Sequence, residues 1–293
     1  MGALMVGIAT VDIAYMVEQY PLEDSKATAS DQILGAGGPA ANAAVAFAAL
    51  EGRSPTLLTA LGRHPLASIA REDLSKHDVS IVDATPDVQH PPTLSSILIS
   101  RSGLTRTIVS RDGADFHPRF TDRYTELLDT ADIVLFDGHH PELASNLAPF
   151  AYARNIPIVL DIGRYKPVYD LLLPLADIAI CSASFQPPEA RTGEPDAILA
   201  YLHQRGVLHA AITNGPEPIR FSSGDATPSD MPISESVVVD TLAAGDTLHG
   251  AFCYYWLKTR SFEDSLAQAS RIATESCQYF GPREWISVAK TCR

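Results

Sequence analysis

The sequence predicts an α/β fold in which helices cover both faces of a mostly parallel sheet. Six short apolar runs, most of them rich in Ile, Val and Leu, are typical of buried strands: residues 4–9, 56–60, 132–136, 156–161, 177–181 and 210–213. Helix-like segments separate several of these runs. Continuous apolar strands that alternate with helices indicate a parallel sheet with both faces buried.

Residues 11–36 and 93–112 break this pattern, because they are more polar and alternate in hydropathy. Within the second segment, a turn at residues 101–104 separates two alternating runs and predicts a hairpin. We therefore expect a single domain over residues 1–293 with a small antiparallel sheet outside the main layers. Three proline-rich stretches, residues 86–92, 187–195 and 216–232, predict loops.

The composition narrows the possible classes of protein. Hydrophobic residues make up 46% of the 293-residue chain and charged residues 19%, which allows a sizeable core. A net charge of −13 argues against nucleic acid or an anionic membrane as a partner. The four cysteines show no CxxC spacing, so a disulfide framework is not expected. Without a leader pattern or an apolar run of 18 residues, a cytoplasmic location is the expectation.

A glycine-rich turn at residues 35–42 leads into an alanine-rich helix. Pro39 suits the first helical turn, where its missing N–H costs nothing. Gly37 and Gly38 allow the backbone to approach a ligand closely. Helical side chains tilt toward the helix N-terminus, so the Asn42 amide can point at that ligand, and an amide suits vicinal sugar hydroxyls. A plain tight turn before a packing helix is the alternative.

A second motif predicts a strand at residues 237–240, followed by a turn of small residues and a helix at residues 246–257. Unpaired N–H groups at the helix start, around Ala244, Gly245 and Asp246, form a site for phosphate oxygens. Asp246 could then accept a proton from an attacking hydroxyl while the amides hold the transferring phosphoryl group. The alternative is an ordinary N-cap aspartate.

Together the two motifs resemble the paired signatures of the ribokinase, or PfkB, family of carbohydrate kinases. The matching residues are Gly37-Gly38-x-x-x-Asn42 and Asp240-Thr241-x-Ala243-Ala244-Gly245-Asp246, and the resemblance covers essentially the whole chain. Residues 7–12 are similar to the family's first strand with its sugar-binding aspartate. Within the family, the motifs most resemble those of sulfofructose kinases and ketohexokinases. The resemblance implies a three-layer α/β/α sandwich with a β-lid formed by segments 11–36 and 93–112.

The resemblance also implies roles for individual residues. Asp246 would be the general base, with an anion hole formed by Ala243, Ala244 and Gly245. Substrate contacts would come from Asp12, Gly37, Gly38, Asn42, Lys26, Arg111 and His139. Nucleotide contacts would come from Thr213, Gly215, Thr241 and Cys277. For Lys26 and Arg111, an ordinary lid surface is an equal alternative, and for His139 an ordinary loop position is.

The implied reaction is ATP + sugar → ADP + sugar phosphate, with a ketose-like substrate as first choice. The implied cofactors are ATP and Mg²⁺, with a monovalent cation such as K⁺ as a further candidate, and no protein-held metal site is expected. The family's Asn-x-x-Glu, tied to Mg²⁺ and phosphate, is missing from residues 181–186, and Pro216 replaces the glycine expected after Gly215. A homodimer through the lid is the implied assembly. A nucleoside kinase of the same fold and a catalytically silent binding protein are the rival hypotheses.

Overall fold

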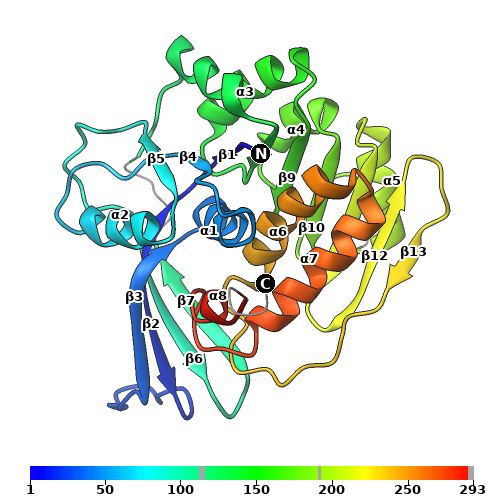
Figure 1. Cartoon of the computed structure of the whole chain (residues 1–293). Helices are drawn as coiled ribbons and strands as arrows, with labels where there is room; N and C mark the ends of the chain where they lie inside the picture. Colours follow the sequence, from blue (N-terminus) through cyan, green and yellow to red (C-terminus); the bar gives the residue numbers. More distant parts are fainter. Residues whose placement is uncertain (112–115, 191–192, 290–293) are drawn as a thin grey trace.

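The computed structural model describes residues 1–111, 116–190 and 193–289, and its centre is a nine-stranded sheet (Figure 1). The strand order is β13-β12-β11-β10-β9-β8-β1-β4-β5. The run from β11 to β5 is parallel, whereas β12 and β13 are antiparallel to their neighbours. The strands are β1 (Ala3–Val6), β4 (Thr56–Thr59), β5 (Ser80–Asp83), β8 (Ile133–Phe136), β9 (Ile158–Ile162), β10 (Ile178–Ser182), β11 (His209–Asn214), β12 (Glu217–Ser223) and β13 (Ser229–Met231).

Helices cover both faces of this sheet, as the sequence predicts. One face carries α1 (Pro39–Glu51), α2 (Ala67–Lys76), α6 (Ala244–Thr259), α7 (Phe262–Ser276) and α8 (Trp285–Ala289). The other carries η1 (Asp122–Thr130), α3 (Pro141–Ala153), α4 (Tyr169–Leu172), η2 (Leu173–Leu175) and α5 (Pro195–Gln204). A separate hydrophobic core fills the space on each side of the sheet, which confirms the three-layer sandwich.

All six predicted strands are present, but two other predictions are wrong. Residues 216–232 form β12 and β13 instead of a loop. Gly215, with φ of 59°, reverses the chain, and Pro218 falls at an irregularity in the β11–β12 register, where no ladder N–H is needed. Residues 237–240 are not a strand, because the N–H groups of Val239 and Asp240 donate to Cys277 O at the end of α7.

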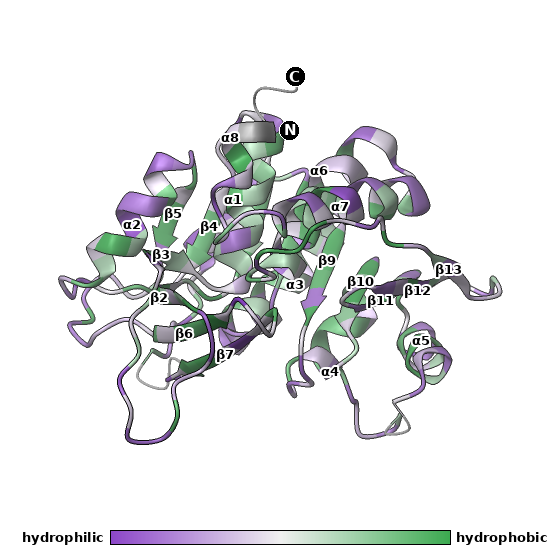
Figure 2. Cartoon of the chain, turned by 90° about the horizontal axis from the view of Figure 1, so that it is seen from below, coloured by the Kyte–Doolittle hydropathy of each residue, from purple (hydrophilic) through white to green (hydrophobic). Residues whose placement is uncertain are grey.

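A second sheet of four strands lies beside the layered body (Figures 1 and 2). Its order is β3-β2-β6-β7, from β3 (Asp31–Gly37), β2 (Thr10–Val17), β6 (Leu94–Ser100) and β7 (Thr105–Ser110). The predicted hairpin joins β6 to β7. The small sheet is mostly antiparallel, as expected, since β2 pairs with β3 and β6 with β7 in antiparallel fashion. Only β2 and β6 pair in parallel, after the chain crosses through α1, β4, α2 and β5. Residue 112 lies outside the described residues.

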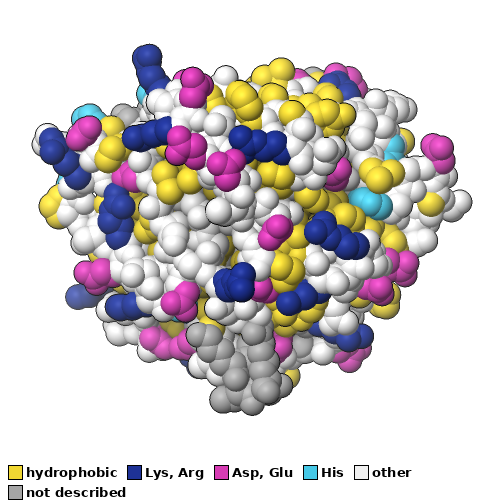
Figure 3. All heavy atoms as spheres, turned by 45° about the horizontal axis from the view of Figure 1, so that its top comes forward, with side chains coloured by type: hydrophobic (Ala, Val, Ile, Leu, Met, Phe, Trp, Pro, Cys, Tyr) yellow, Lys and Arg dark blue, Asp and Glu magenta, His cyan; other side chains and the backbone are white. Residues whose placement is uncertain are grey.

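The surface agrees with a globular protein of mixed charge. On the face drawn in Figure 3, acidic and basic side chains are interspersed, and hydrophobic side chains are exposed among them, some in small groups near the top of the view. Within the described ranges, no helix combines the length and apolar character that crossing a membrane would require.

Helices α1 and α6 pack unusually closely, because small residues meet where they cross. A Cβ added at Gly250 would lie 2.1 Å from Ala43 O and 2.8 Å from Ala46 Cβ. The first turns of α1 and α6 carry the two sequence motifs, so this contact brings the motifs together.

We predict that Gly250→Ala separates α1 from α6 and destabilises the protein by about 1–3 kcal/mol, the usual cost of overpacking. Thermal unfolding measures the effect. Gly163→Ala is the matched control, because a Cβ at Gly163 would have no atom within 4 Å. Equal melting temperatures for the two variants would contradict this account of the helix contact.

Candidate active site

A large cleft of about 1330 Å³ lies at the carboxyl ends of the parallel strands. Ligand pockets typically measure roughly 300–1,000 Å³, so this cleft has room for two small ligands. Crevices at this edge of a parallel sheet are the usual ligand sites of α/β proteins. Asp12 from β2, Gly38 and Asn42 at the start of α1, and Asp246 at the start of α6 all line it. The two motifs therefore share one site.

The start of α6 is built as an anion-binding turn. Ala243 is the N-cap, in the left-handed conformation with φ of 60°, and Ala244 is the first helical residue. The first amides of a helix have no partner within it, so those of Gly245 and Asp246 can bind an anion in the cleft. Because Asp246 is the third helical residue, the alternative interpretation of it as the N-cap is wrong.

The Asp246 carboxylate meets the first motif directly. Its Oδ2 accepts a hydrogen bond of 2.8 Å from Asn42 Nδ2. Burial raises the pKa of Asp246 above its usual value, and the hydrogen bond from Asn42 opposes that rise. Asp12 is similar, since burial raises its pKa while the hydroxyl of Thr10 donates to its Oδ1.

Two further carboxylates line the cleft, and the sequence motifs do not identify them as site residues. Asp137 follows β8, and its Oδ2 accepts from Ile8 N at 2.9 Å and from Ala40 N at 3.2 Å. It therefore joins the end of β1 to the start of α1. Gly7 is required here, because a Cβ would lie 2.1 Å from the Asp137 carboxyl carbon. The sequence did offer one signal for Asp137, which is that this acidic residue directly follows the predicted strand at residues 132–136.

Asp161, at the end of β9, pairs with His249 from α6. His249 Nδ1 lies 3.5 Å from Asp161 Oδ2 and 2.8 Å from Gly245 O, and its Nε2 lies 3.1 Å from Ile180 O. Burial raises the pKa of Asp161 to about 6, although His249 favours its ionised form. The pair thus links β9, β10 and the anion-binding turn beneath Asp246.

Most of the other predicted site residues also line the cleft: Ala243, Ala244, Gly245, His139, Thr213, Gly215, Thr241 and Cys277. Three do not. Gly37 lies behind Asp12, where a Cβ would be 1.9 Å from its Oδ2. Lys26 is exposed in the loop between β2 and β3, and Arg111 is exposed just after β7; neither lines the cleft here, and their substrate contacts stay predictions.

Three basic side chains at the site were not predicted from the motifs. Arg106 on β7 donates to the hydroxyl of Thr241, across the cleft from the second sheet. Lys166, after β9, donates to Asp137 O at 2.9 Å. Arg283 approaches Asn42 from the C-terminal segment. The sequence around Arg283 carries no ligand-binding pattern, so only the fold could reveal it.

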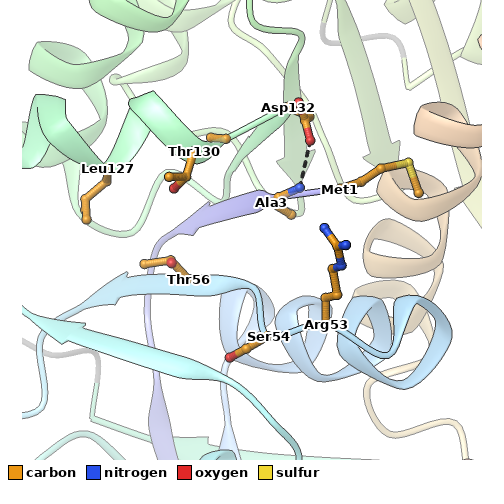
Figure 4. A pocket seen from close by; sticks show the side chains of 10 residues that line it. Met1, Ala3, Arg53, Ser54, Thr56, Leu127, Thr130 and Asp132 are labelled. Carbon is orange, nitrogen blue, oxygen red and sulfur yellow. Dashed lines mark hydrogen bonds between the residues drawn. The ribbon is translucent and has the colours of Figure 1, made fainter.

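A smaller cavity of about 310 Å³ lies at the opposite, amino end of β1 (Figure 4). Arg53, Ser54 and Thr56 line it, and Gly2 N donates to Asp132 Oδ2 at 2.8 Å. This cavity is separate from the main cleft, because the two lie at opposite ends of β1 and share no lining residue.

Comparisons with known proteins give the family and the fold of the chain. A ribokinase of Arabidopsis thaliana is 27% identical over 95% of this chain and 76% of its own length. A mouse ketohexokinase is 23% identical over 94% of this chain and 95% of its own. A crystal structure from Agrobacterium tumefaciens with a provisional ribokinase assignment superposes with a TM-score of 0.85 at 26% identity, over 99% of this chain and 98% of that one. The model of the pfkB family carbohydrate kinases matches residues 3–288, and the chain belongs to this family.

Proposed function

We propose that the protein is an ATP-dependent sugar kinase in which Asp246 is the general base. The observation that carries the proposal is the meeting of two motifs in one cleft, with the buried Asp246 carboxylate hydrogen-bonded to Asn42 beside free helix amides. The Arabidopsis thaliana ribokinase has been solved with ribose and ATP, which supports both ligands for this fold.

In this mechanism the sugar lies between β2 and the start of α1, with its hydroxyls near Asp12 and Asn42. The attacking hydroxyl oxygen forms a bond to the γ-phosphorus while the bond from that phosphorus to the bridging oxygen of ATP breaks. Asp246 takes the hydroxyl proton, and ADP leaves. The amides of Gly245 and Asp246 would stabilise the transferring phosphoryl group.

Positive charge for the triphosphate would come from the chain and from Mg²⁺. Arg106 and Lys166 line the cleft and would offset phosphate charge. Across the described ranges, no group of three or more His, Cys, Asp or Glu is arranged to hold a metal. This fits Mg²⁺ entering with ATP, held by phosphates and waters, which Mg²⁺ commonly keeps. We also propose that a monovalent cation such as K⁺ supports catalysis. Comparing kcat in potassium buffer with kcat in tetramethylammonium buffer tests this part of the proposal.

We propose a ketose-like sugar as the acceptor. Thr10, Ser95 and Ser110 line the cleft beside Asp12, and hydroxyl groups suit a polyol. Among the described residues that line the cleft, none is Phe, Tyr or Trp, which disfavours a nucleoside whose base would stack. ADP release over a panel of ketoses, aldoses and nucleosides tests the choice. Turnover of nucleosides alone would overturn it.

The second sheet is proposed as a lid that also pairs two subunits. Val109 and Leu34 on it are 70% and 55% exposed, and β7 is an edge strand, so the sheet offers apolar area and an unpaired edge. Analytical ultracentrifugation tests the pairing.

We expect sugar binding to slow hydrogen exchange in β2, β3, β6 and β7, because closure would shield their amides from solvent. Exchange measured by mass spectrometry with and without saturating sugar gives the readout, and β8 in the core is the internal control. Equal protection of the second sheet in both states would exclude a lid.

We predict that Asp246→Asn lowers kcat by roughly 10²–10⁴-fold, because the amide cannot accept the hydroxyl proton. Sugar affinity should change much less, since the amide is nearly isosteric and can still face Asn42. Steady-state kinetics and calorimetric binding separate the two effects. A folded variant with the kcat of the wild type would end the assignment of Asp246 as the base.

Asn42→Ala should shift the acidic limb of the kcat/KM profile to higher pH. Burial already raises the pKa of Asp246, and the variant loses the hydrogen bond that favours its ionised form. The base is therefore lost at a higher pH as the solution is acidified. Asn146→Ala, a change on the exposed side of α3, is the control. An unchanged acidic limb in Asn42→Ala would show that this hydrogen bond does not tune the base.

A further inference from the structure

Arg283, in the segment between α7 and α8, joins parts of the chain that are far apart in sequence. Its Nη1 donates to Asn42 Oδ1 at 2.9 Å, and its Nη2 donates to Ala36 O at 2.9 Å. Its Nε and Nη2 lie 3.2 Å and 3.1 Å from Asp73 Oδ2 on α2. The side chain is 15% exposed, so these partners replace most of its contact with water.

The Asn42 amide has a defined direction because of its two partners. Its Oδ1 accepts from Arg283, and its Nδ2 donates to Asp246. A guanidinium can only donate and an ionised carboxylate can only accept. A flipped amide would bring donor against donor and oxygen against oxygen, so both partners hold the same orientation.

We propose that Arg283 is a positioning residue for phosphoryl transfer, which holds the Asn42 amide in the orientation that donates to Asp246. The inference rests on the proposed function, since it takes Asp246 as the base. Arg283 does not line the cleft, and its hydrogen-bonded route to the base runs through Asn42. Its positive charge also acts through space on the neighbouring Asp12, and the double variant in the experiment below separates such a charge effect from positioning.

The orientation matters because Asp246 lies among other charges. The titratable groups whose charges act on Asp246 are Asp12 on β2, Asp137 after β8, Asp161 on β9, His249 on α6 and Arg106 on β7. Three of these five are carboxylates, and they disfavour a further negative charge. The hydrogen bond from Asn42 favours the ionised base and opposes both these carboxylates and burial.

The segment that carries Arg283 is itself held in place. Gly281 N donates to Asp240 Oδ2 at 2.9 Å, and Leu242 N donates to Asp240 Oδ1 at 2.8 Å, so the segment is fixed to the turn before the anion-binding amides. Buried Trp285 donates to Pro282 O at 3.1 Å. The backbone that carries the Arg283 side chain is therefore held in a fixed position, which suits the guanidinium to orient the Asn42 amide.

The experiment measures the Asp246 carboxyl directly, so that it does not depend on turnover. Protein labelled with ¹³C at aspartate carboxyls is titrated by NMR, and the Asp246 signal is assigned by its loss in Asp246→Asn. The variants are Arg283→Met, Asn42→Ala and the double variant. Arg71→Met is the matched control. Arg71 lies on α2, the helix that carries Asp73, and forms an ion pair with Asp83, but it does not line the cleft.

We expect Arg283→Met and Asn42→Ala each to raise the pKa of Asp246, and the double variant to match Asn42→Ala alone. Arg71→Met should leave that pKa unchanged even where it lowers the melting temperature. With any sugar that the wild type phosphorylates, kcat/KM at pH 6 should fall roughly tenfold in Arg283→Met, the size of a hydrogen bond to a charged group.

An unshifted Asp246 in folded Arg283→Met, or effects that add in the double variant, would overturn the inference. If Arg283→Met does not fold, Arg283→Lys replaces it and should give a smaller shift in the same direction, because one ammonium cannot reproduce three directed donors. A shifted Asp246 without turnover of any sugar would reject the proposed function, while the control of the Asn42 amide by Arg283 would stand.

Discussion

The hydrogen bond between Asn42 and Asp246 is the contact on which the rest of the site depends. It joins the glycine-rich turn to the anion-binding turn, although 204 residues separate them. The bond requires α1 and α6 to touch almost backbone to backbone, and Gly250 against Ala43 makes that approach sterically possible. A kinase needs its acceptor hydroxyl, base and phosphoryl group within bonding reach of each other. Here the reach is set by how closely two helices pack.

The electrostatics of the cleft follow from a second constraint, which is that four carboxylates share a poorly hydrated space. Three of them accept hydrogen bonds: Asp137 from the amides of Ile8 and Ala40, Asp12 from the hydroxyl of Thr10, and Asp246 from the amide of Asn42. The fourth, Asp161, has the ring of His249 3.5 Å from its Oδ2, which accepts no hydrogen bond from the described residues. The cations Arg106 and Lys166 lie in the same cleft, where they would offset the negative charge of the proposed nucleotide.

The predictions from sequence that were wrong concern segments whose structure is set by contacts with distant parts of the chain, not by their local composition. The three valines at 237–239 have the composition of a strand, yet the backbone there bonds to the end of α7, because a strand needs a neighbour in the right place. The proline-rich stretch after Gly215 forms a hairpin, because Pro218 meets a register irregularity that requires no N–H from it. Parallel pairing of β2 with β6 depends on a long crossover, which alternating hydropathy cannot reveal.

The sequence by itself determined the class of fold, the two turns and the identity of the candidate base. Those features are local, since glycines, small residues and an acidic residue at a helix start act over a few positions. Only the tertiary structure decided which side chains surround that base. Arg283 reaches Asn42 across 241 residues, and Asp137 reaches Ile8 across 129. Partners so distant leave no periodicity or spacing to read, because their proximity arises only when helices and strands have packed.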